Sequence, residues 1–229
     1  MSNAATPENR VQRVEEELVG VARWPATIAV LLIGGVFFTI SSQYTLGPRW
    51  AVLAVIAALL IPLWVTRRRG MHPWTHRIAL ALNGVLTLAV ASSAGLLLYR
   101  LSTGETQALR LLGDAVLIWI TNIVVFALWY WNLDAGGPAK RHPGKHASSD
   151  FAFPQQQQDD DGEVEGWSPG FTDYLFLAFN TSTAFSPTDT LVLARRMKVL
   201  MMLQSAISLL IVAVLAARAI NTIGGSPSP

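Results

Sequence analysis

The sequence predicts an all-α membrane protein with five transmembrane helices and one short re-entrant, pore-type helix before the last span. Hydrophobic residues make up 52% of the 229 residues and charged residues only 14%, whereas soluble domains carry roughly 25% charged residues. The apolar residues are gathered in long uncharged runs, as they are in transmembrane helices. One apolar stretch, residues 172–183, is too short to span, because a helix of this length covers roughly 18 Å of a bilayer core of roughly 30 Å.

The uncharged runs define the order of the elements. A polar N-terminal segment, predicted to be cytoplasmic, occupies residues 1–23. A three-span N-terminal half follows over residues 24–110, with predicted spans at 25–46, 50–66 and 78–99. The channel-like half covers residues 111–222 and holds, in order, a fourth span at 111–133, a linker at 134–170, the half-helix and a last span at 199–217. Residues 223–229 form a tail.

The linker is polar, rich in Gly and Pro and ends in an acidic run, so it cannot bury enough apolar surface to fold alone. Its apolar island, Phe151-Ala-Phe153-Pro154, is expected to dock on the membrane surface. Ser168 and Pro169 are predicted to start the half-helix as its N-cap and first helical residue. Thr188 or Asp189 can cap the last helix in the same way.

The distribution of basic residues predicts the sidedness. Of the 17 Lys and Arg residues, 13 fall in segments on one predicted side of the membrane and 4 on the other. Because basic residues concentrate on the cytoplasmic side of membrane proteins, the N-terminus, the linker and the re-entrant loop are predicted to be cytoplasmic. The protein is accordingly expected in the cell inner (plasma) membrane, with the lipid bilayer as a partner.

The half-helix and the residues after it form the candidate pore element. Non-helical backbone within the bilayer is tolerated only where protein buries it or where it lines a watery cavity. Hydroxyls and backbone carbonyls of this stretch could bind a permeating ion; the candidate residues are Thr181, Thr183, Ala184, Phe185, Ser186, Pro187, Thr188 and Asp189. The alternative interpretation is a short amphipathic helix that lies on the membrane surface.

Four polar side chains in or beside the spans are candidates for helix packing: Asp114, Asn122, Gln204 and Ser208. Asn122 lies near the middle of the fourth span, where a hydrogen bond to Gln204 or Ser208 would contribute on the order of 0.6 to 2 kcal/mol. Asp114 lies near one end of the same span. A carboxylate inside the membrane would indicate function, but the first turn of a helix favours a carboxylate in any case, and we favour the structural role.

From Phe179 onward, the chain resembles the pore loop and inner helix of tetrameric potassium channels. Phe179-Asn-Thr-Ser-Thr183 falls at the end of that family's pore helix, and Ala184-Phe-Ser-Pro-Thr188 falls at its Thr-Val-Gly-Tyr-Gly filter. Asp189 matches the aspartate that follows the filter. Ser186 and Thr188 replace the two filter glycines and Pro187 replaces the tyrosine. The resemblance therefore implies a pore without potassium-type selectivity.

The chain also resembles a bacterial five-span inner-membrane family that is catalogued as a domain of unknown function. Four features carry this resemblance: Phe151-Ala-Phe153-Pro154, Asp173-Tyr174, the Thr183 to Asp189 stretch, and Arg195-Arg196. It covers roughly the last 120 residues and implies no established activity.

These observations predict a multi-pass membrane protein that forms an oligomeric, ion-channel-like pore, with four copies by analogy and ions as further partners. One alternative is a non-conducting scaffold or accessory subunit, and another is a sensor whose cytoplasmic linker binds lipid headgroups or a partner. An enzyme, a cofactor and nucleic acid are not expected, because no nucleophile–base pair or nucleotide-binding motif stands out. The absence of Cys excludes disulfides and thiolate sites. The pairs His72/His76 and His142/His146 lie in loops too loose to predict a metal site.

Overall fold

The computed structural model describes residues 24–40, 44–45, 49–103, 108–138, 140–141, 149–157, 167–183 and 189–224. Most of them are helical: α2 (Trp24–Thr39), α3 (Arg49–Arg68), α4 (His72–Thr103), α5 (Ala108–Leu133), α6 (Pro154–Gln157), α7 (Phe171–Thr183) and α8 (Arg195–Gly224). A 3-10 turn, η2 (Asp134–Gly136), follows α5. Two short strands, β1 (Phe151–Ala152) and β2 (Leu191–Val192), pair with each other.

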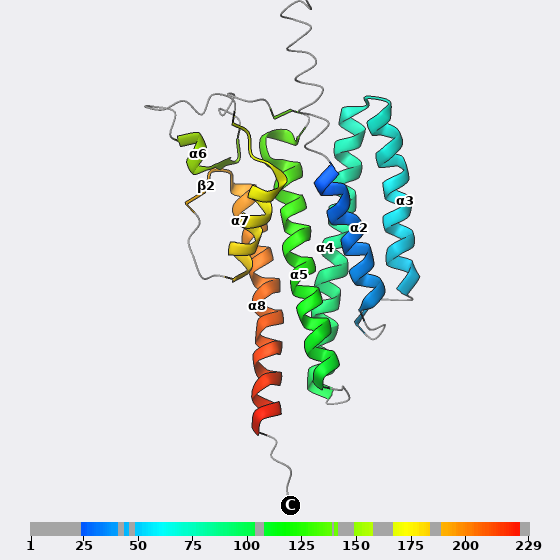
Figure 1. Cartoon of the computed structure of the whole chain (residues 1–229), viewed down its shortest axis with the longest axis vertical. Coiled ribbons are helices and arrows are strands. Elements are labelled where there is room, and N and C mark those ends of the chain that lie inside the picture. The colour runs from blue at the N-terminus through cyan, green and yellow to red at the C-terminus, as the bar shows by residue number, and fades with distance from the viewer. Residues whose placement is uncertain are drawn as a thin grey trace, which may run out of the picture.

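Three of these helices are long and apolar enough to cross a membrane: His72–Leu101, Arg110–Gly136 and Arg195–Ile220. The helix over Ala26–Thr39 is apolar but shorter. The chain is therefore an all-α membrane protein, as its composition predicted. Figure 1 shows α2, α3, α4, α5 and α8 side by side with their axes roughly parallel, and α5 in the middle of the group.

The helix bounds differ from the predicted ones mainly near prolines and turns. The first helix ends at Thr39, well before residue 46. The third begins at His72 rather than at residue 78, because Pro73 is tolerated in the first turn of a helix. His72 and His76 therefore lie on the start of a helix rather than in a loop. Pro62 lies inside α3.

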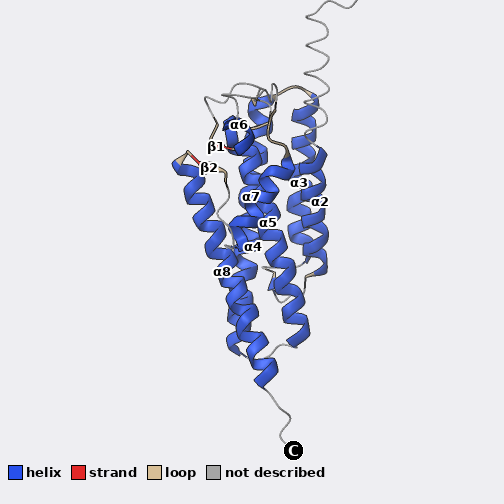
Figure 2. Cartoon of the chain, turned by 60° about the vertical axis from the view of Figure 1, so that its left-hand side comes forward, coloured by secondary structure: helices blue, strands red, loops and turns tan. Residues whose placement is uncertain are grey.

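Helix α7 has 13 residues, so it is roughly 20 Å long. Tyr174, Leu177, Ala178 and Ser182 form its buried face, which packs between α5 and α8. Near its end, the Ser205 hydroxyl of α8 donates to the Thr181 carbonyl over 3.3 Å. Ser205 is ten residues after the start of α8, so α7 ends roughly 15 Å along α8. Figure 2 shows α7 beside the upper part of α8 only.

Strand β2, which follows α7 in the chain, lies at the end of the bundle where α7 begins. Strand β2 pairs antiparallel with β1, with Phe151 opposite Val192 and Ala152 opposite Leu191. The Phe151 ring lies 6.3 Å from the Tyr174 ring in the first turn of α7. The start of α7, β1, β2 and the start of α8 thus lie together at one end of the bundle.

The structure corrects three local predictions. Phe151 and Phe153 are buried in the protein instead of docking on a membrane surface. Helix α7 begins at Phe171 rather than at Pro169, because the Asp173 carboxylate accepts a 2.7 Å hydrogen bond from the Gly170 amide and caps the helix there. Asp189 does not cap the last helix, which begins six residues later at Arg195, because strand β2 and its pairing with β1 come between them.

Candidate functional site

A sharp turn at the end of α5 directs Asp134 into the protein. Ala135, Gly136 and Gly137 follow with positive φ angles of 53°, 77° and 95°, a region that L side chains seldom adopt. A Cβ on Gly137 would lie 2.9 Å from the Asn132 carbonyl oxygen and 3.2 Å from His76 Nδ1. The Gly-Gly pair therefore permits a close approach that folds the chain back over the end of α5.

The turn places Asp134 in a group of five residues that we call the interface cluster: Asp134, Arg141, Asp150, Tyr174 and Arg196. Asp134 is fully buried. Its carboxylate accepts hydrogen bonds from the Tyr174 hydroxyl at 2.5 Å, the Asp150 amide at 2.7 Å and Ser149 Oγ at 3.0 Å. Buried carboxylates are stable only when hydrogen-bonded or paired, and these three donors meet that need.

Tyr174 donates to Asp134 because its phenol stays protonated. Burial raises the pKa of Tyr174 well above its ordinary value, while the nearby Arg141 opposes that rise and Asp134 adds to it. The Arg141 guanidinium lies 4.8 Å from the centre of the Tyr174 ring and 4.7 Å from that of Trp131. It also donates to the Trp131 carbonyl over 2.8 Å. Arg141 thereby holds the start of α7 against the end of α5.

Asp150 connects the cluster to the last helix. Its carboxylate is paired with Arg196, whose Nε donates to Asp150 Oδ1 over 3.1 Å. Arg196 also donates to the Leu133 carbonyl at the end of α5 over 3.3 Å. The Asp150 carbonyl accepts from the Leu193 amide over 2.9 Å. The interface cluster thus joins the end of α5 and the starts of α7 and α8.

Aromatic rings close over the cluster. Phe153 meets Tyr174 edge-on with ring centres 5.5 Å apart and meets Trp167 at 5.8 Å. Phe151 meets Tyr130 edge-on at 5.5 Å. Such pairs contribute about 0.5–1.5 kcal/mol beyond their buried area, and the Phe151, Phe153 and Tyr174 side chains are buried.

A second set of polar side chains lies deeper, between α5, α7 and α8. We call it the polar core network: Asn122, Tyr130, Ser182, Gln204 and Ser208, all of them buried. Gln204 Nε2 donates to the Ala178 carbonyl at 2.7 Å and to Ser182 Oγ at 2.6 Å, and Gln204 Oε1 accepts from the Tyr130 hydroxyl at 2.5 Å. The Gln204 side chain therefore joins the three helices.

The structure brings together the packing residues expected around Asn122. Its Nδ2 donates to Ser208 Oγ at 2.8 Å and to the Gln204 carbonyl at 3.3 Å, so both anticipated partners are used. Asp114 is buried, but α5 begins at Ala108. Asp114 is therefore not in the first turn of its helix.

The structure describes only three of the candidate pore residues, Thr181, Thr183 and Asp189. The Thr181 hydroxyl donates to the Leu177 carbonyl at 2.8 Å, and the Thr183 hydroxyl donates to the Phe179 carbonyl at 3.1 Å, so both are satisfied by their own helix. Asp189 is exposed near the start of β2. Ala184, Phe185, Ser186, Pro187 and Thr188 lie outside the described residues.

Sequence patterns point only weakly to the interface cluster, because Asp134, Arg141 and Asp150 lie in the segment assigned to a linker. One signal was available: Asp134 follows an aromatic helix end and precedes a Gly-Gly-Pro turn. Within the part of the chain that the structure describes, no three His, Asp or Glu side chains gather as a metal site requires. His142 and His146 lie outside that part.

Comparison of the chain with protein-family models, with curated proteins and with solved structures finds no match.

Proposed function

We propose that the protein crosses the inner membrane five times, through α2, α3, α4, α5 and α8, and that α7 enters and leaves the bilayer on the cytoplasmic side. Several copies, four by analogy, would assemble so that α5, α7 and α8 surround an ion-conducting pore. The observation that carries the proposal is helix α7, which has about half the length of a span and is buried between two long apolar helices. The described chain before α7 and the strand β2 after it lie at the same end of the bundle.

The depth of α7 supports this topology. A surface helix would lie across the ends of α5 and α8, whereas α7 lies along them and reaches Gln204 and Ser205 of α8. At roughly 20 Å, its 13 residues cannot cross a bilayer core of roughly 30 Å. A polar side chain at that depth needs a partner inside the protein, and Gln204 supplies one to Ser182.

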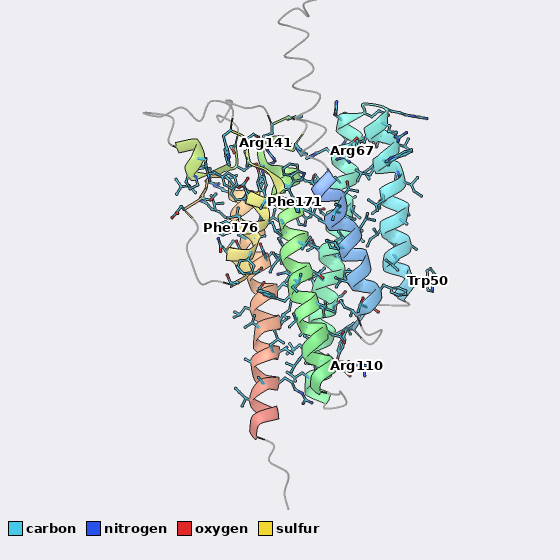
Figure 3. The ribbon with its side chains drawn as sticks, viewed as in Figure 1. Trp50, Arg67, Arg110, Arg141, Phe171 and Phe176 are labelled. Carbon is cyan, nitrogen blue, oxygen red and sulfur yellow. The ribbon has the colours of Figure 1, made fainter. Side chains whose placement is uncertain are left out.

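The basic side chains support the sidedness. Figure 3 shows Arg67 and Arg141 near one end of the bundle and Arg110 near the other. Arg141 and Arg196 belong to the interface cluster, at the end where α7 begins. Because Lys and Arg concentrate on the cytoplasmic side, this end would face the cytoplasm.

The C-terminal end of α7, which would lie near the middle of the bilayer, supports cation binding there. The C-terminal end of a helix carries the negative end of its dipole, which favours a cation. Asp189 is exposed where the chain returns, and a carboxylate at the mouth would raise the local concentration of cations. A single copy cannot enclose a pore with α5, α7 and α8, so conduction requires an assembly around an axis.

A non-conducting scaffold or accessory subunit is the second candidate. One observation favours it: the hydroxyls of Thr181 and Thr183 bond to their own helix, and Ser182 bonds to Gln204. In that case, α7 would serve only to pack α5 against α8.

Flux measurements separate the two candidates. The full chain, reconstituted in liposomes, is expected to dissipate an imposed K⁺ or Na⁺ gradient. Asp189→Asn should lower cation flux severalfold, because it removes the charge at the mouth, while Asp189→Glu, which keeps the charge, should not. No flux over a range of ions and voltages would reject conduction and favour the scaffold. A monomer in lipid nanodiscs would reject the assembled pore independently.

A further inference from the structure

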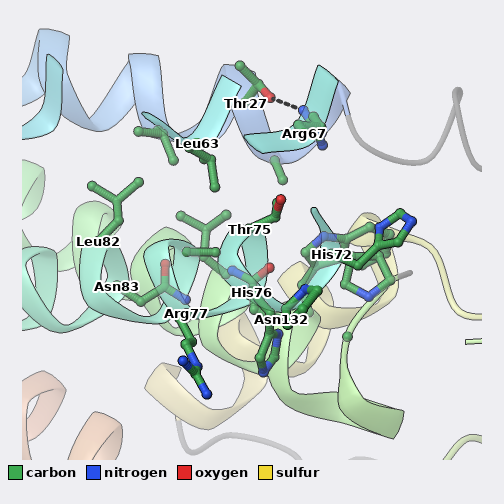
Figure 4. A pocket seen from close by; sticks show the side chains of 18 of the residues that line it. Thr27, Leu63, Arg67, His72, Thr75, His76, Arg77, Leu82, Asn83 and Asn132 are labelled. Atoms are coloured by element: carbon green, nitrogen blue, oxygen red, sulfur yellow. Dashed lines mark hydrogen bonds between the residues drawn. The ribbon is translucent and has the colours of Figure 1, made fainter. Parts of the chain in front are cut away.

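A cavity of about 410 Å³ lies among α2, α3, α4 and α5. It opens at the end of the bundle where α3 ends and α4 begins (Figure 4). Apolar side chains form much of its wall, among them Val30, Leu60, Leu63, Leu82 and Leu128. Its volume falls within the roughly 300–1,000 Å³ that is typical of small-molecule sites.

The lining of the cavity is positively charged at its opening. The cations Arg67, Arg77 and Lys140 line it, together with the imidazoles of His72 and His76. They come from the end of α3, the start of α4 and the segment after α5. No Asp or Glu appears among the described residues that line the cavity. An anionic group would therefore meet several cations there and no opposing carboxylate.

One polar side chain lies deeper in the cavity. Asn83 is only 1% exposed, and its Nδ2 has no hydrogen-bond partner within the described structure. Figure 4 shows Asn83 next to Leu82, away from Arg67 and His72 at the opening. An unsatisfied buried donor costs about 1–3 kcal/mol. A ligand that brings an acceptor to this depth would remove that cost.

We propose that this cavity binds an anionic glycerophospholipid. The phosphate would lie among Arg67, His72 and Lys140, and an acyl chain would fill the space beside Leu63 and Leu82. An ester carbonyl, which lies between the phosphate and the acyl chains, is an acceptor for Asn83. Basic pockets between transmembrane helices on the cytoplasmic side suit anionic lipid headgroups, and this cavity lies at the basic end of the bundle. The proposal does not depend on whether the protein conducts ions.

Lipid binding is testable by native mass spectrometry of the full chain in detergent, with phosphatidylglycerol or phosphatidylcholine added as the probe. Phosphatidylglycerol is expected to bind in clear preference. Arg67→Gln combined with Lys140→Gln should lower its affinity by roughly 10- to 30-fold, because each basic residue contributes about one factor of five. Arg68→Gln is the matched control, since Arg68 is exposed, stacks 4.0 Å from the Trp64 ring and does not line the cavity.

Two further variants probe the depth of the cavity with all charges retained. Leu63→Trp should fill the space for the acyl chain and abolish the preference for phosphatidylglycerol. Asn83→Leu should weaken binding yet leave the thermal stability of the lipid-free protein unchanged or raised, because it removes an unpaired donor. A purely structural role for Asn83 would lower that stability instead.

The same experiment can overturn the proposal. Equal binding of the two lipids, or equal effects of the Arg67/Lys140 and Arg68 variants, would reject an anionic lipid site. Displacement of phosphatidylglycerol by inorganic phosphate at matched concentration would assign the cavity to a free anion and would also reject the lipid.

Discussion

At the scale of single residues, Asp134 is the fully buried carboxylate of the interface cluster. Its buried carboxylate has three donors from two parts of the chain, the adjacent residues Ser149 and Asp150 and the more distant Tyr174. A buried carboxylate that loses a donor keeps its desolvation cost without the compensating bond. The residues around Asp134 therefore act as a unit, and their substitutions should be non-additive.

Tyr174→Phe is expected to lower the free energy of unfolding by about 1.5–3 kcal/mol, because it removes a hydrogen bond to a charged group. Thermal unfolding in detergent measures the change. In an Asp134→Asn background, the same substitution should cost clearly less, since the charge is already gone. Equal costs in both backgrounds would mean that the hydroxyl and the carboxylate are not coupled.

Gly137→Ala is expected to destabilise the protein by about 1–3 kcal/mol, because the added Cβ meets a backbone oxygen at 2.9 Å and φ is positive. Gly113→Ala is the matched control. Gly113 lies inside α5, and a Cβ there has nothing within 4 Å, so this change should be neutral or stabilising. Equal melting temperatures for both variants would show that the turn tolerates a side chain.

At the scale of elements, hydrogen bonds with a polar side chain of the neighbouring helix α8 hold α7 in place. Its exposed face includes Phe176 and Phe179, and its buried face meets Tyr130 and Gln204 through the polar core network. A helix of 13 residues is marginal alone. The position of α7 therefore depends on α5 and α8, and substitutions of Gln204 should lower the stability of α7.

Gln204→Leu is expected to destabilise the protein by about 1–3 kcal/mol, because it leaves Tyr130 and Ser182 without their buried partner. Amide hydrogen exchange in α7 should become faster, as measured by mass spectrometry. Ser205→Ala, the control at the next position, removes a single 3.3 Å bond from an exposed residue and should change stability by less than about 0.5 kcal/mol. Unchanged amide hydrogen exchange in α7 would show that the polar core network does not stabilise that helix.

At the scale of the whole molecule, the basic cavity and the interface cluster lie at the same end of the bundle. The interface cluster joins the end of α5 to the starts of α7 and α8, and the basic cavity opens where α3 ends and α4 begins. If α7 is re-entrant, these features share the cytoplasmic face.

The chain contains no Cys, so single cysteines report this topology without background. A membrane-impermeant maleimide should label Arg68→Cys and Arg195→Cys from the same membrane face, and Arg110→Cys from the opposite face. All three residues are exposed, and detergent treatment should make all of them reactive. Labelling of Arg68→Cys and Arg195→Cys from opposite faces would mean that α7 crosses the bilayer.

The sequence by itself determined that this is an all-α membrane protein with a half-length helix before its last long helix, because apolar run length is a local property. It also anticipated the bond from Asn122 to Gln204 and Ser208, since few polar side chains occur in those runs. Only the tertiary structure decided that Asp134, Arg141 and Asp150 belong to a buried cluster, and that Phe151 and Phe153 are covered by protein. Their partners Tyr174 and Arg196 lie 40 and 46 positions from Asp134 and Asp150. Asp134, Arg141 and Asp150 lie in or beside a segment rich in polar side chains, so the sequence does not single out their partners, and the pairing forms only when the ends of α5, α7 and α8 pack together.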